Sequence, residues 1–158
     1  MSRKTLCKTI NGEDCEILTI SSRDDLENYH KRKGVIITAR VHPGETVGSW
    51  MMRGLLNFLT DPDNHEAKLL RENFVFKVIP MLNPDGVING NYRCSLAGCD
   101  LNRRWKTPSK VIHPTIYHVK KLVNQIQEER GLTLFCDLHG HSRKNNVFMY
   151  GCNRLENP

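Results

Sequence analysis

The sequence lacks a long apolar run, and none of its unbroken apolar stretches exceeds a few residues. A helix that crosses a bilayer needs about 20 such residues, so we expect no membrane span. The first ten residues have no apolar core and no small-residue cleavage site, so we do not expect the protein to be secreted. No two of the six cysteines have CxxC spacing, so neither a zinc ribbon nor a thioredoxin-like motif is predicted. These absences favour a cytoplasmic protein with reduced thiols.

Low-complexity tracts and internal repeats are also missing, and the sequence has the composition of a globular domain. The 158 residues are 39% hydrophobic and 25% charged, enough for a core without disulfides. Lys and Arg number 23 against 17 acidic residues, a net charge of +6 that favours acidic partners. The basic residues are scattered and follow no nucleic-acid-binding motif. Nucleic acid, an anionic membrane and an acidic peptide would each fit this charge, and nucleic acid is the weakest of the three.

Strand-like and helix-like patterns alternate along the chain. The alternation predicts an α/β fold whose mixed, largely parallel sheet is flanked by helices. Thr46 is the expected N-cap of the first long helix, and residues 83–98 have the composition of a loop. The expected strands are residues 15–20, 35–39, 74–79, 132–138 and 146–150, and the expected helices are 46–60, 65–72 and 113–130.

Polar residues with metal-binding chemistry follow two of these strands. His42 and Glu45 lie three apart on a turn after residues 35–39, and His139 and His141 follow residues 132–138. Sites in α/β sheets form at the carboxyl ends of strands, so the two groups are expected to meet. Two His and one Glu, with a long gap before the third ligand, are typical of catalytic zinc. By residue type alone, either His139 or His141 could be that ligand.

A third segment adds arginines near the expected metal. It runs from Asn83-Pro84-Asp85-Gly86 to Asp100-Leu101-Asn102-Arg103 and contains Arg93 and several amides. Arginine binds carboxylates through two parallel hydrogen bonds. The segment therefore favours a substrate that carries a carboxylate.

Taken in order, five segments resemble the zinc metallocarboxypeptidases: HPGE, NPDGV, GNYR, DLNRRW and DLHGHS. They resemble most closely the cytosolic carboxypeptidases, which trim glutamates from tubulin tails, and the similarity extends over residues 6–152. The resemblance implies a zinc-carboxypeptidase-like fold and one zinc ion. It also implies removal of C-terminal glutamates from acidic tails such as polyglutamylated tubulin, so the expected partners are acidic peptide tails, with no nucleic acid and no membrane. A cytoplasmic location, in association with the cytoskeleton or the cilium, is implied as well.

The same resemblance implies a role for each motif residue. Asp100 resembles the acid that orients the first histidine ligand, and His141 matches no ligand and is expected to line the site. Arg93 resembles the arginine that polarises the scissile carbonyl. The implied zinc ligands are His42, Glu45 and His139, and the residues implied to grip the substrate's C-terminal carboxylate are Asn102 and Arg103.

The chain departs from the family's pattern after the third ligand. The family's general base is a glutamate further along the domain, whereas Glu156 is the only acid after His139 and lies in no matching motif. We therefore expect residues 1–158 to be a partial catalytic domain that lacks its C-terminal part, with residues 1–20 compatible with the end of a preceding β-rich domain. Two alternatives remain: a non-catalytic module that binds acidic tails, and a related zinc hydrolase of small acyl-amino acids.

Overall fold

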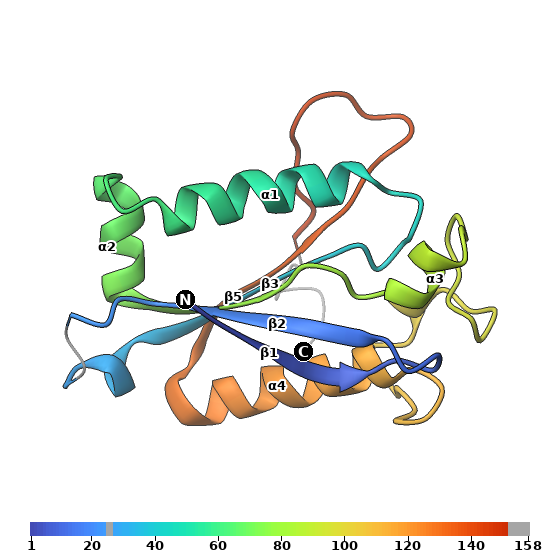
Figure 1. Cartoon of the computed structure of the whole chain (residues 1–158), viewed down its shortest axis with the longest axis horizontal. Coiled ribbons are helices and arrows are strands. Elements are labelled where there is room, and N and C mark those ends of the chain that lie inside the picture. Colours follow the sequence, from blue (N-terminus) through green and yellow to red (C-terminus); the bar gives the residue numbers. More distant parts are fainter. Residues whose placement is uncertain (25–26, 152–158) are drawn as a thin grey trace.

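The structure, a computed structural model, describes residues 1–24 and 27–151. These residues form a five-stranded sheet in the order β1-β2-β4-β3-β5 (Figure 1). Its strands are β1 (Ser2–Lys8), β2 (Asp14–Ile20), β3 (Lys33–Ala39), β4 (Phe74–Ile79) and β5 (Leu132–Leu138).

The sheet is mixed, as predicted. β3 lies between β4 and β5 and is parallel to both, whereas β2 is antiparallel to β1 and to β4. Parallel pairing among the described strands is therefore confined to β4, β3 and β5. β1 was not predicted because most of its residues are polar and exposed, and only Cys7 is buried. Its pairing with β2 makes it a strand.

Helices cover both faces of the sheet, with α1 (Val47–Thr60) on one face and α4 (Pro114–Arg130) on the other (Figure 1). α2 (His65–Asn73) lies between α1 and β4 in the chain, and the short α3 (Pro84–Ile88) follows β4. Two 3-10 turns are η1 (Tyr29–Lys31) and η2 (Leu101–Arg103). Within the described part of the chain, no helix is both long and apolar enough to cross a membrane.

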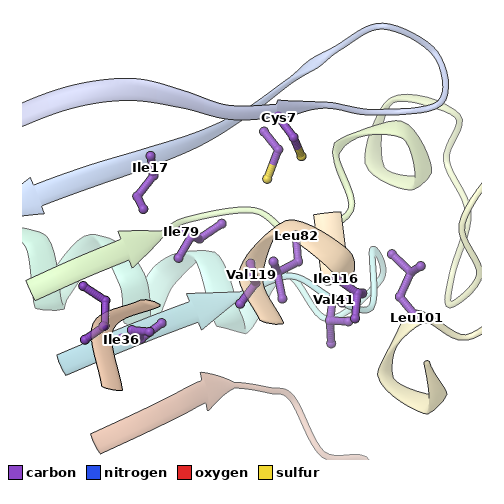
Figure 2. Close-up of a cluster of buried hydrophobic side chains, with 11 residues drawn as sticks. Cys7, Ile17, Ile36, Val41, Ile79, Leu82, Leu101, Ile116 and Val119 are labelled. Atoms are coloured by element: carbon purple, nitrogen blue, oxygen red, sulfur yellow. The ribbon is translucent and has the colours of Figure 1, made fainter. Parts of the chain in front are cut away.

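The alternation of side chains along β3 divides the core into two clusters. Val35 and Ile37 pack with Met52 and Leu59 of α1. Ile36 belongs to the cluster with α4 that includes Ile79, Ile116 and Val119 (Figure 2). Burial on both sides explains why β3 is a continuous β-branched run rather than an alternating one.

Three local predictions were wrong. Residues 146–150 form no strand, and Val147 is 93% exposed, with no strand of the described residues paired to its backbone. Thr46 precedes α1 but makes no side-chain cap, because its own φ and ψ are already helical. Residues 83–98 are not all loop, since the Asn83 side chain accepts a hydrogen bond from Gly86 and caps α3.

Candidate metal centre

The turn after β3 holds His42 and Glu45, and Arg40 shapes it. Arg40 has a φ of 57°, a conformation uncommon for residues other than glycine. Its buried guanidinium donates two hydrogen bonds to the Pro43 carbonyl, at 3.2 and 2.7 Å, and one to Ser49 Oγ at 2.6 Å. Arg40 thereby ties the turn to the first turns of α1.

His42 is 4% exposed and lies between two carboxylates. Its Nδ1 is 2.8 Å from Glu45 Oε1, and its Nε2 is 3.0 Å from Asp100 Oδ1. Burial opposes ionisation of Asp100, but hydrogen bonds from His42, from the Asn102 backbone and from Arg93 lower its pKa below the usual value. Asp100 thus contacts the ring nitrogen that points away from Glu45.

His139 follows β5 and contacts the other oxygen of the same carboxylate. Its Nδ1 is 3.0 Å from Glu45 Oε2, an oxygen that also accepts a 2.8 Å hydrogen bond from the Gly140 amide. Its Nε2 is 2.7 Å from Asp137 Oδ2. The hydrogen bond to Asp137 is the main cause that raises the pKa of His139, with Glu45 adding to it and burial opposing it.

His42, Glu45 and His139 each place one ligand atom within 4.8 Å of the other two. Two imidazole nitrogens and a carboxylate oxygen suit zinc. Both Nδ1 atoms face Glu45, whereas both Nε2 atoms face another acid, so the Nδ1 atoms are the ones placed to bind an ion. The donor set of this chain therefore fits the metal that the sequence predicts.

His141 lies outside this cluster. It is exposed, its Nδ1 accepts hydrogen bonds from the Arg143 and Lys144 amides at 3.1 and 3.0 Å, and its ring packs against Phe148. Of the two histidines that residue type alone left open, the structure brings only His139 to Glu45.

Arg93 is linked to the metal cluster through Asp100. Its Nε and Nη2 lie 2.9 and 2.8 Å from Asp100 Oδ2, and its side chain is 44% exposed. The preceding residue, Tyr92, accepts a 2.7 Å hydrogen bond from the Gly44 amide through its backbone oxygen. The loop with Arg93 is thus fastened to the turn between His42 and Glu45.

Asn102 and Arg103 lie on η2, whose start Asp100 caps by accepting a hydrogen bond from the Asn102 amide. The Asn102 side-chain oxygen accepts a 2.8 Å hydrogen bond from Trp105 Nε1. Arg103 is exposed, and its guanidinium pairs with no acid of residues 1–24 or 27–151. Arg103 is therefore available to a carboxylate from outside.

Sequence reasoning missed Asp137 and Arg40. Asp137 lies in the predicted strand 132–138, two residues before His139, and this spacing was the local signal for it. No local pattern indicated Arg40, because its contacts depend on how the turn folds back. Glu156, the only acid after His139 in the sequence, lies outside the described residues.

Sequence comparison finds relatives along the whole chain. The family model for zinc carboxypeptidases matches residues 1–158. Cytosolic carboxypeptidase 2 of Xenopus tropicalis is 54% identical over 156 residues, which cover 98% of this chain and 16% of that protein. Cytosolic carboxypeptidase 4 of Mus musculus is 55% identical over 158 residues, which cover 96% of this chain and 14% of that protein. The chain thus spans only a small part of these curated relatives.

Comparison with solved structures also finds carboxypeptidases. A metallo-carboxypeptidase from Burkholderia cenocepacia matches with a TM-score of 0.79 and 31% identity, over 89% of this chain and 36% of that one. A carboxypeptidase A from Helicoverpa armigera, at 17% identity and a TM-score of 0.68, shares the fold.

Proposed function

The chain belongs to the zinc carboxypeptidase family, and from this premise we propose that it provides the zinc site of a metallocarboxypeptidase that removes C-terminal glutamates from acidic protein tails. The observation that supports this most is the convergence of His42, Glu45 and His139, with Arg93 hydrogen-bonded to the acid behind His42. We extend the proposal to polyglutamylated tubulin as the substrate class. We also extend it to a cytoplasmic location near the cytoskeleton or cilium, because the relatives are named cytosolic carboxypeptidases.

Zinc, when bound, lowers the pKa of its water to about 7 and polarises a carbonyl. The residues of the chain would orient the ligands and stabilise the negative charge that develops on the substrate. Asp100 holds Nε2 of His42 so that Nδ1 remains directed at Glu45. The exposed guanidinium of Arg93 can donate to the oxygen on which negative charge develops.

Selection of the last residue of a tail would come from the η2 segment. A free C-terminal carboxylate can accept two parallel hydrogen bonds from Arg103, and the Asn102 amide lies on the same turn. The net charge of +6 adds long-range attraction for glutamate-rich tails.

Within the described site, Glu45, Asp100 and Asp137 each face an imidazole. None of the three is therefore free to act as a general base, a role worth about 10²–10⁴ in rate. Zinc binding is accordingly the first property to test, and glutamate release the second.

The experiment measures the zinc content of the purified chain and glutamate release from a polyglutamate peptide, with His42→Ala as the test variant. His65→Ala is the matched control, because His65 is exposed on α2. We expect one zinc per chain for wild type and for His65→Ala, and a large loss for His42→Ala. Equal zinc content in all three proteins would overturn the proposal.

Two further outcomes would support the alternatives. Binding of acidic tails that survives chelation and His42→Ala, without glutamate release, would indicate a non-catalytic module. Hydrolysis of N-acyl-aspartate but not of peptides would indicate a small acyl-amino-acid hydrolase.

A further inference from the structure

We infer that Asp137, held by Thr38, is a positioning residue that selects which nitrogen of His139 binds the metal. The inference rests on the proposed zinc site. It concerns the acid that contacts the second histidine, the first residue of the DLHGHS segment, to which neither the motif nor the family resemblance gave a role.

The contacts around Asp137 form a chain from the core to the metal cluster. Thr38 Oγ1 donates a 2.6 Å hydrogen bond to Asp137 Oδ1, and Asp137 Oδ2 lies 2.7 Å from His139 Nε2. His139 Nδ1 then faces Glu45 Oε2 at 3.0 Å. Each carboxylate oxygen of Asp137 thus has one partner, Thr38 for Oδ1 and His139 for Oδ2.

The sheet sets this arrangement. β3 and β5 pair in parallel with Thr38 opposite Asp137, so the hydroxyl and the carboxylate are neighbours by register. Thr38 is completely buried, and a buried hydroxyl needs a partner, which restrains Asp137 from rotating away. The side chain of Asp137 is 13% exposed, so water competes weakly for its oxygens.

An imidazole without such a partner can turn about its side-chain bonds and present either nitrogen. A hydrogen bond that occupies Nε2 leaves Nδ1 as the ligand and stiffens the ring. His42 has the corresponding support from Asp100, but Asp100 also binds Arg93 and the Asn102 amide. Among the described residues Asp137 contacts Thr38 and His139 but neither Arg93 nor Asn102, so its loss should affect the metal site without releasing Arg93.

The test measures zinc affinity by competition with a chelator, with Asp137→Ala, Asp137→Asn and Thr38→Val. We expect about 10–100-fold weaker zinc binding for Asp137→Ala, the usual cost of losing the acid behind a metal-bound histidine. Asp137→Asn keeps an acceptor for Nε2–H and should recover part of the affinity. Thr38→Val keeps the shape of the side chain and should weaken zinc binding by a smaller factor.

Two measurements separate positioning from a merely structural role. Urea unfolding of the metal-free proteins should rank the variants differently from zinc affinity. The absorption bands of the cobalt-substituted Asp137→Ala protein should differ from wild type, because a turned ring changes the coordination geometry. Asp63→Ala, an exposed acid in the α1–α2 connection, is the matched control and should behave as wild type.

The outcomes also distinguish this inference from the proposed function. If wild type binds no zinc, the proposed function fails and the inference falls with it. If wild type binds zinc and Asp137→Ala binds it within twofold of wild type, with an unchanged cobalt spectrum, only the positioning role of Asp137 is overturned.

Discussion

Gly44 offers the sharpest test of how the metal turn and the arginine loop are joined. A Cβ at this position would lie 2.6 Å from Cδ2 of Tyr92 and 2.7 Å from its backbone oxygen. The Tyr92 ring is 78% exposed and can turn aside. Its backbone oxygen cannot, because it accepts the 2.7 Å hydrogen bond from the Gly44 amide. Gly44→Ala must therefore push the two segments apart.

The magnitude follows from these contacts. Forcing extra atoms into a packed site costs about 1–3 kcal/mol, and losing one hydrogen bond costs about 0.5–1.5 kcal/mol. We expect Gly44→Ala to lower the free energy of unfolding by about 1.5–4.5 kcal/mol, the two costs being added. Arg93 follows Tyr92 in the chain, so the same shift should loosen its contact with Asp100.

Urea unfolding followed by circular dichroism would measure the effect, with Gly54→Ala as the matched control. Gly54 lies inside α1 and a Cβ there meets nothing within 4 Å, so alanine should stabilise the chain by about 1 kcal/mol. If Gly44→Ala unfolds at the wild-type urea concentration with an unchanged m-value while Gly54→Ala stabilises, the proposed clash is refuted.

Three further variants test other parts of the structure by urea unfolding. Arg40→Lys cannot keep both hydrogen bonds to Pro43 and should lose about 1–3 kcal/mol; wild-type stability would contradict this. Asn83→Ala removes the cap on the Gly86 amide and should cost about 1–2 kcal/mol, a loss that Asn83→Asp, also a capping residue, should reduce. Burial, with nearby lysines, lowers the pKa of His118, so its contribution to stability is complete above about pH 6.5 and is lost as the pH falls toward the lower folded value. His118→Gln in the metal-free chain should flatten this decline, and an equal slope would argue against it.

The predicted family and the zinc-carboxypeptidase-like α/β fold are both confirmed. Four strands and three helices lie within a few residues of their predicted positions, because their patterns are local. β3 is a run of β-branched residues, and α4 has apolar residues at helical spacing before Gly131. β1 escaped prediction because pairing, not burial, makes it a strand. Residues 146–150 were predicted as a strand on composition alone, and no described strand pairs with them.

Side-chain type and spacing indicated that His42, Glu45 and either His139 or His141 can hold zinc, and the resemblance to zinc carboxypeptidases implied His139. His42 and Glu45 are three residues apart, and a turn after a buried strand brings such a pair together. Which groups meet across the molecule is a different matter, because it depends on strand register and on how the loops fold back. The pairing of Ala39 with Leu138 brings His139 to Glu45, and that of Thr38 with Asp137 places the acid behind it. Only the tertiary structure could assign Asp137 and Arg40, since each acts through partners that are distant in sequence or that depend on backbone geometry.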